Sequence, residues 1–280
     1  MFTRRAVLAT AAALPIAAYA AEGSDARFAA LEKEKGGRIG VAAIDTNTGQ
    51  RIAWRANERF LMCSTFKLLL VSATLKRIEQ RLEQPHRHIT YTQADLLGWA
   101  PVTKLHVAEG MDVIDLCAAA IDHSDNTAAN LLYVPLGGPE ALQRFAHTTL
   151  RDATTRIDRN EPALNYPDGD KDTTTPAAML ADMHTILLGN TLSLASRKQI
   201  TAWMIGNTTG DKQIRMGLPA GWAVGDKSGN GSGAHNDLAI AIPPGRKPIL
   251  ISAYTFGCGT EEDEQGTTAA IARIVADVFA

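Results

Sequence analysis

The feature that most constrains the fold is the placement of strand-like sequence, which is confined to the two ends of the chain. Near the start, residues 39–44 and 51–54 flank a turn rich in Asp, Asn, Thr and Gly, which predicts a β-hairpin. The segments with the same character near the end are residues 222–227, 238–242 and 249–256. Because the sequence between the two ends has helical periodicity, we expect one five-stranded antiparallel sheet of the α+β class, with an inserted all-helical domain.

Helical periodicity places a helix beside each end of this sheet. The first covers residues 25–35, and the last follows a capping box at 260–263 and presents Ile271 and Val278 on one face. The helices expected in the middle cover residues 68–82, 112–121, 126–132, 139–148, 176–188 and 196–205. Residues 154–175 have little periodicity and are expected to form a long loop, a kind of segment that is usually functional or disordered.

These elements predict two domains in the mature chain. Residues 21–55 and 206–280 are expected to form the α/β sheet domain, and residues 56–205 the helical domain. With 45% hydrophobic residues, the 280-residue chain is long enough for a substantial core.

The N-terminus is expected to be a targeting segment. Arg4 and Arg5 precede an apolar stretch, residues 6–18, that ends with small residues at the cleavage-site positions. The arginine pair resembles a twin-arginine export signal, and the alternative is an ordinary export signal with a chance arginine pair. Since the stretch is too short for a membrane anchor, we expect residues 1–20 to be removed from a periplasmic or secreted protein.

Composition argues against several other classes of protein. The formal net charge is -2, with no cluster of basic residues that would indicate a nucleic-acid partner. The three cysteines, Cys63, Cys117 and Cys258, form no C-x-x-C pair and are expected to be buried thiols. His86-Arg87-His88 begins like a zinc motif, but Thr90 stands where an aspartate is needed, so neither a metal site nor another cofactor is expected.

Ser64-Thr65-Phe66-Lys67 is the first pattern that carries chemistry. A serine hydroxyl is a poor nucleophile unless a base or a cation lies beside it. At a helix start, residues three apart share a face, so Lys67 can reach Ser64, and free backbone N–H groups can stabilise an oxyanion. Taken alone, the spacing is equally compatible with an ordinary helix start.

Two further triplets follow in the chain. In Ser124-Asp125-Asn126, the serine can relay a proton, the asparagine can hold a substrate amide, and Asp125 is expected to brace the turn or cap the next helix. Lys227-Ser228-Gly229 stands at the end of a predicted edge strand, where a lysine and a hydroxyl can bind a carboxylate and a glycine allows close backbone approach. Each triplet alone is more typical of a helix cap or of a strand running into a turn.

The three patterns together resemble the signature of the serine β-lactamase and penicillin-binding protein superfamily. Glu161-Pro162-Ala163-Leu164-Asn165, in the long loop, then resembles the Ω-loop of class A β-lactamases. A carboxylate and an amide on such a loop can activate a water against an acyl-serine ester, a step that penicillin-binding transpeptidases lack. The resemblance covers essentially the whole mature chain, and the four motifs together are highly specific.

The resemblance implies a role for each matching residue. Ser64 is the nucleophile, Lys67 and Glu161 share the role of base for acylation, Glu161 is the base for deacylation, and Ser124 passes a proton to the lactam nitrogen. Substrate binding is expected from Asn126, Asn165, Lys227, Ser228, Gly229 and Asn230, with an oxyanion hole from the N–H groups of Ser64 and Asn230. The implied partner is a small β-lactam, bound by a monomer that contacts neither nucleic acid nor, in its mature form, membrane.

The sequence also departs from the family pattern. The arginine that helps to hold the substrate carboxylate is missing, and the aligned positions carry Gln213, His235 and Gln265. Neither disulfide of the family can form, since Gly231 and Val71 stand where partners of Cys63 and Cys117 would be. The Ω-loop is two residues shorter than usual, and Trp99 falls where the family often has an aromatic at the cleft mouth.

Two alternatives remain open at this point. A penicillin-binding DD-peptidase would carry the three short motifs without Glu161 and Asn165, and usually a membrane tether or an extra domain. A β-lactam sensor domain would be acylated and stay acylated, and would follow transmembrane helices.

Overall fold

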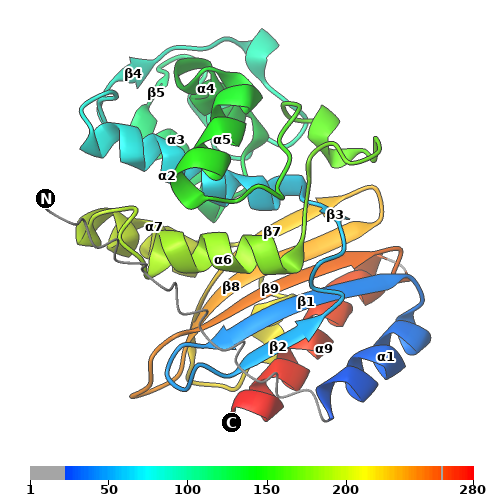
Figure 1. The fold of residues 1–280 in the computed structure, drawn as a ribbon. Coiled ribbons are helices and arrows are strands. Elements are labelled where there is room, and N and C mark those ends of the chain that lie inside the picture. The colour runs from blue at the N-terminus through cyan, green and yellow to red at the C-terminus, as the bar shows by residue number, and fades with distance from the viewer. Residues whose placement is uncertain (1–22, 260) are drawn as a thin grey trace, which may run out of the picture.

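The computed structural model describes residues 23–259 and 261–280, with the side chains of 261–265 left aside. Five strands form one antiparallel sheet in the order β2-β1-β9-β8-β7 (Figure 1). Their bounds are β1 Arg38–Asp45, β2 Arg51–Trp54, β7 Ala223–Gly231, β8 Ala234–Ile242 and β9 Ile249–Phe256. The predicted α+β class with a five-stranded antiparallel sheet is confirmed.

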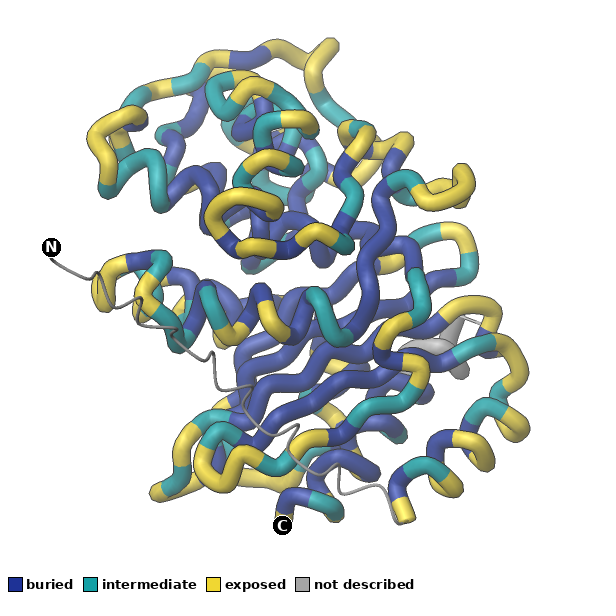
Figure 2. The backbone as a smooth tube through the Cα atoms, in the orientation of Figure 1, coloured by how far each residue is buried: buried dark blue, intermediate teal, exposed yellow. Residues whose placement is uncertain are grey.

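Each face of the sheet is covered by helices because both faces are apolar. In β1, Ala42 and Ile44 pack in one hydrophobic cluster while Val41 and Ala43 pack in another, as the alternation of a strand requires. Helices α1 (Ser24–Lys35) and α9 (Glu261–Phe279) lie on the second of these faces, the one that carries Val41 and Ala43 (Figure 1). The sheet is therefore buried between two helical layers, as its dark blue strands in Figure 2 show.

The middle of the chain forms the helices on the other face. They are α2 Phe66–Glu79, α3 Val113–Asp122, α4 Asn126–Leu136, α5 Gly138–Phe145, α6 Pro176–Leu187 and α7 Leu194–Gly206. Sheet residues such as Leu238 and Tyr254 belong to the same apolar cluster as α2 and α6. One core therefore joins the inserted helices to the sheet, and the domain boundaries at residues 55 and 206 stay a prediction.

Several elements differ from the sequence prediction in length. Strands β7 and β8 continue through polar residues to meet in a hairpin where Gly231 pairs with Ala234, and the hydrophobic pattern alone missed this extension. Helix α2 ends at Glu79, short of the expected 82, and Leu82 is 61% exposed. Helix α5 gives way to a π turn, Ala146–Leu150, where the sequence predicts α-helix through residue 148.

The structure also contains short elements that the hydrophobic pattern of the sequence did not predict. They are the strand pairs β3 Phe60–Leu61 with β6 Thr173–Thr174 and β4 His88–Ile89 with β5 Met111–Asp112, and the helix α8 Ile214–Gly217. The first pair matters for the site, because it fixes the chain just before Ser64 to the end of the long loop.

The predicted export signal, residues 1–20, and the capping box at 260–263 lie outside the residues whose side chains are described. Across the rest of the chain, no helix is both long and apolar enough to span a membrane.

Candidate active site

Ser64 lies where a 3-10 turn, Cys63–Thr65, runs into helix α2. Lys67 is one turn further on, and its Nζ lies 2.6 Å from Ser64 Oγ. The helix start thus brings the two side chains into direct contact, as the spacing of three residues predicted. Both residues are buried at the base of a cleft, with only 8% of Ser64 exposed.

The Lys67 ammonium is surrounded by oxygen atoms from three further residues, two of them in the segment 124–126 and one in the long loop. It donates to Asn126 Oδ1 at 2.6 Å, to Glu161 Oε1 at 2.8 Å and to the Ser124 carbonyl at 3.1 Å. The side chains of Lys67 and Glu161 are completely buried, so each ion needs the other to offset the loss of hydration. Ser64 Oγ also lies 3.3 Å from Glu161 Oε1, which gives the hydroxyl proton a carboxylate acceptor.

Glu161 is held rigidly although it belongs to the long loop. The Asn130 side chain brackets its backbone, donating to the Glu161 carbonyl at 2.9 Å and accepting from its N–H at 3.1 Å. Asn165 Nδ2 donates to Glu161 Oε2 at 2.5 Å. Asn165 Oδ1 is buried and accepts no hydrogen bond from the described residues, so it is available to a molecule in the cleft.

An ion pair closes the two ends of this loop. Arg159 Nε lies 2.6 Å from Asp172 Oδ2, and Asp172 Oδ1 accepts from the backbone N–H groups of Asp158 and Arg159 at 2.8 and 3.0 Å. Arg159 also donates to the Tyr166 carbonyl at 2.7 Å, across the loop. Asp172 is only 1% exposed, so its carboxylate depends on these donors.

The second half of the cleft is built on the edge strand β7. Lys227 Nζ donates to Ser124 Oγ at 3.0 Å, and the hydroxyls of Ser228 and Thr209 lie 2.6 Å apart. Asn230, further along β7, is exposed at the mouth of the cleft. This end offers hydroxyl and amide groups to a ligand, with one lysine beneath them.

Burial, together with the neighbouring Lys67 ammonium, lowers the pKa of Lys227 to about 7. The carboxylates of Asp226, Asp237 and Glu161 act in the opposite direction and favour the charged form. The charge of Lys227 therefore changes within the physiological pH range, where an ordinary lysine would stay cationic.

Gly229 is required by packing against the nucleophile. A Cβ at Gly229 would lie 2.8 Å from the Met62 carbonyl oxygen and 2.9 Å from the Thr65 nitrogen, closer than side chains are found. The sequence interpretation gave this glycine a close approach to the ligand, whereas the approach in the structure is to the segment around Ser64. The absence of a side chain lets β7 lie directly against the start of α2.

Asp125 and Trp99 occupy the positions suggested for them. Asp125 caps helix α4 by accepting from Ala128 N at 2.9 Å, and its other oxygen accepts from the backbone of Val102 and Thr103 at 3.0 and 2.9 Å. Trp99 is 53% exposed at the mouth of the cleft. The expected brace and cap of the Ser124 turn are confirmed.

The cleft between these groups has a volume of about 620 Å³. Cavities of roughly 300–1,000 Å³ are typical sites for drug-sized ligands. Its lining includes six of the predicted residues, Ser64, Ser124, Asn126, Asn165, Ser228 and Asn230. Lys67, Glu161 and Lys227 lie beneath that lining, so the ionic groups are shielded from bulk water while hydroxyl and amide groups face the ligand.

Two of the positions where the family arginine is missing are described. Gln213 is buried, and its Nε2 lies 3.5 Å from Asn230 Oδ1, while its Oε1 has no partner among the described residues. His235 is buried in β8 and pairs in the sheet register with Asn230, which lines the cleft, but His235 is not itself part of the lining. Gln265 is among the side chains not described.

Sequence reasoning missed two residues of this site. Asn130 comes one helical turn after Asn126, so the spacing could have placed both on one face of α4. Thr209 follows the end of α7 in a loop without periodicity, and nothing in the sequence signals its contact with Ser228. Among the described residues, no group of three or more His, Cys, Asp or Glu side chains has the geometry to hold a metal ion.

Comparison with known proteins gives a family for this arrangement. Residues 24–279 match the model of the beta-lactamase enzyme family. The chain is 40% identical to beta-lactamase OXY-1 of Klebsiella oxytoca over 98% of its length and 97% of that protein's length. It is 50% identical to an ancestral class A β-lactamase whose solved structure superimposes with a TM-score of 0.89, covering 91% of this chain and all of the other. The chain belongs to the class A β-lactamases.

Other relatives agree with this assignment. Beta-lactamase L2 of Stenotrophomonas maltophilia is 44% identical, over 98% of this chain and 90% of that protein. A solved class A β-lactamase from Mycobacterium abscessus is 46% identical with a TM-score of 0.88, covering 91% and 99% of the two chains. As a class A β-lactamase, the chain is a serine hydrolase.

Proposed function

We propose that this class A β-lactamase hydrolyses penicillin- and cephalosporin-type antibiotics through an acyl-serine intermediate and so gives antibiotic resistance. The observation that carries the proposal is the contact of Ser64 Oγ with both Lys67 Nζ and Glu161 Oε1, at 2.6 and 3.3 Å, at the base of the cleft. A nucleophile with two candidate bases, one of them on the Ω-loop, supplies both acylation and deacylation.

In the acylation step, Ser64 Oγ attacks the lactam carbonyl carbon and its proton passes to the pair formed by Lys67 and Glu161. Lys67 acts as base once its own proton has moved to Glu161, 2.8 Å away, so either route leaves the proton on this pair. The oxyanion is stabilised by the N–H groups of Ser64 and Asn230.

Opening the ring breaks the bond from the carbonyl carbon to the lactam nitrogen, and that nitrogen takes a proton from Ser124 Oγ. The Lys67–Glu161 pair then returns to Ser124 the proton that it took from Ser64, so Glu161 is again a carboxylate before deacylation. Lys227, 3.0 Å from Ser124 Oγ, supplies hydrogen-bond support to this transfer. Lys227 and Ser228 bind the substrate carboxylate, and Asn126 binds the side-chain amide. In the absence of the arginine, the Thr209 hydroxyl orients Ser228.

In the deacylation step, a water molecule between Glu161 and Asn165 attacks the ester. Glu161 takes a proton from that water, while Asn165 Oδ1 can accept its second hydrogen. The ester bond to Ser64 Oγ then breaks, and the proton returns to that oxygen. The restraint of Glu161 by Asn130 supports this role, because a general base must be positioned within hydrogen-bond reach of its water.

The decisive experiment is intact-protein mass spectrometry of Glu161→Ala after mixing with a penicillin. An adduct on Ser64 with the mass of the whole drug is expected to accumulate, with deacylation slowed by at least about 10²–10⁴-fold, the effect of losing a general base. Ser64→Ala is the control and should give no adduct. Turnover by Glu161→Ala at the parent rate, without an adduct, would contradict the mechanism. A stable adduct in the unmutated protein would point instead to a transpeptidase or a sensor.

We further propose that the enzyme acts as a monomer outside the cytoplasm, periplasmic or secreted, after cleavage of residues 1–20. The support is the arginine pair and the apolar stretch of the N-terminal sequence. N-terminal sequencing of protein recovered from the periplasm should begin at Ala21.

A further inference from the structure

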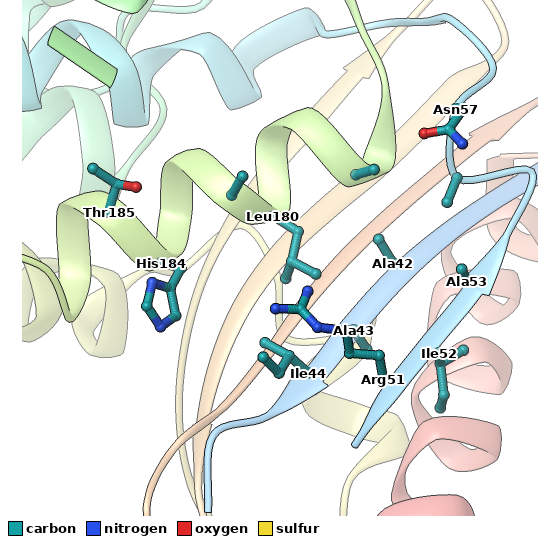
Figure 3. Close-up of a pocket in the computed structure, with 13 residues that line it drawn as sticks. Ala42, Ala43, Ile44, Arg51, Ile52, Ala53, Asn57, Leu180, His184 and Thr185 are labelled. Atoms are coloured by element: carbon teal, nitrogen blue, oxygen red, sulfur yellow. The ribbon is translucent and has the colours of Figure 1, made fainter. Parts of the chain in front are cut away.

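A second cavity, remote from the catalytic cleft, lies between the edge of the sheet and helix α6 (Figure 3). One wall is formed by strands β1 and β2 and the segment after them, and the other by one face of α6. The α6 residues in the lining are Ala177, Leu180, Ala181, His184 and Thr185. Their spacing of three and four residues places them on a single face of the helix.

The cavity exists because small side chains face each other across the gap. Ala42, Ala53 and Ala56 stand opposite Ala177 and Ala181, and none of these five is long enough to close the space. Leu180 and Ile44 complete the apolar lining. At its start, α6 is joined to the segment after β2 by a backbone hydrogen bond of 2.9 Å from Ala177 N to the Ala56 carbonyl.

Arg51 stands at the solvent-exposed rim of the cavity. Arg51 points from β2 into the gap, toward Leu180 and His184 (Figure 3). Neither the Arg51 guanidinium nor the His184 ring has a hydrogen bond or an ion pair with any described residue. The 13 residues that line the cavity include no Asp or Glu. An apolar floor and an uncompensated cation at the rim together form an environment for an anion with an apolar tail.

We propose that this cavity binds a medium-chain aliphatic monocarboxylate, with the carboxylate on Arg51 and the chain against the alanines of β1, β2 and α6. A guanidinium can hold a carboxylate through two parallel hydrogen bonds, and His184 can add a third donor. The cavity holds about 250 Å³, against about 620 Å³ for the catalytic cleft, so it suits a ligand smaller than a drug.

Sodium octanoate is the probe, titrated into the mature protein by isothermal calorimetry. One site is expected, with a dissociation constant on the order of 1 mM, which is ordinary for a ligand of this size. Octylamine, which has the same chain and the opposite charge, should bind at least tenfold more weakly. The melting temperature should rise with octanoate concentration, because a ligand that bridges the sheet and α6 binds only the folded state.

Two variants test the contacts. Arg51→Glu should weaken octanoate binding at least tenfold, and Ala181→Leu should do the same by filling the cavity. Lys33→Glu is the matched control, since it makes the same change of charge on α1, across the sheet, and should leave binding unchanged. Arg51→Gln removes the charge but leaves a polar side chain, so it should still weaken octanoate binding. It is the substitute variant if Arg51→Glu does not fold.

Octanoate bound equally by the parent, Arg51→Glu and Ala181→Leu would overturn the proposal, as would the absence of saturable binding. Binding must also persist after Ser64 has been acylated in the Glu161→Ala protein, because loss on acylation would place octanoate in the catalytic cleft. Hydrolysis of a chromogenic cephalosporin should be unchanged in Arg51→Glu and Ala181→Leu. A failure of this site is thus separate from a failure of the proposed function.

Discussion

The two ends of the catalytic cleft are built differently. At the nucleophile end, Lys67 and Glu161 are fully buried, and hydrogen bonds with Ser124, Asn126 and Asn165 fix them. At the end formed by β7, the ligand meets the hydroxyls of Ser228 and Thr209 and the exposed amide of Asn230, with Lys227 beneath. Loss of a partner is costlier at the first end, because a buried ion left alone costs several kcal/mol, whereas the second end can exchange neutral donors.

We expect the nucleophile end to set the rates of the chemical steps and the β7 end to set the affinity for the substrate. The buried ion pair is the part that the proposed acylation and deacylation steps require, and its geometry leaves little freedom. The hydroxyl end relies on one lysine, whose pKa is lowered to about 7. Substitutions at the two ends should therefore change different kinetic constants.

The largest effect is expected from Lys67→Ala. The change removes a base in contact with Ser64 Oγ and leaves Glu161 buried without its counter-ion, so acylation should slow by about 10²–10⁴-fold. The measurement is the acylation rate with a penicillin in stopped flow. Lys76→Ala, on the outer part of the same helix, is the matched control and should acylate at the parent rate. An acylation rate in Lys67→Ala within threefold of the parent would contradict the claim that acylation requires the buried ion pair.

A smaller effect is expected from Lys227→Ala at the other end. Loss of a charged hydrogen-bond donor to the substrate carboxylate costs about 1.5–3 kcal/mol, or roughly 10–150-fold in kcat/KM, mainly through a higher KM. Lys227→Arg keeps the charge and should recover most of the loss. A fall in kcat with an unchanged KM would show that Lys227 acts only through its contact with Ser124 and does not bind the substrate carboxylate.

The pH dependence of KM tests the same lysine without a mutation. Since burial lowers the pKa of Lys227 to about 7, the side chain is an ammonium below that pH and becomes neutral above it. The carboxylate of the substrate stays ionised throughout, so KM should rise by up to about tenfold between pH 6 and pH 8. Lys227→Arg should flatten this rise. A KM independent of pH from 6 to 8.5 would contradict the assignment.

The smallest effect is expected from Asp172→Asn, which sharpens the comparison by loosening only the nucleophile end. The change weakens the pair with Arg159, whose side chain is 21% exposed, so the cost should stay below the full penalty for a buried pair, at about 1–3 kcal/mol. We expect a lower melting temperature and deacylation slowed several-fold, with KM unchanged. Asp168→Asn, at an exposed pair in the same loop, is the control. A melting temperature and a deacylation rate equal to those of the parent would show that the Arg159–Asp172 pair does not position Glu161.

The buried acid Asp182 shows how much of the electrostatics lies outside any motif. It stands mid-helix in α6, and burial together with the neighbouring Asp152 raises its pKa to about 9. Helical periodicity placed this helix within one residue of its observed end, but it gave no sign of two carboxyl groups meeting in the core. Contacts of this kind depend on how α6 packs against the segment after α5, which no local pattern encodes.

The sequence by itself determined the class of sheet, nearly all the long helices and the residues of the four motifs. Each of these rests on local information: the period of apolar residues, the turn residues between strands, and the spacing of three that puts Lys67 beside Ser64. Only the tertiary structure decided how the motifs meet. In the tertiary structure, β7 continues through polar residues to Gly231, and Gly229 lies against the start of α2. The same packing buries Lys227, which lowers its pKa to about 7. These features follow from the packing of side chains far apart in the chain, where desolvation and close approach outweigh local preference.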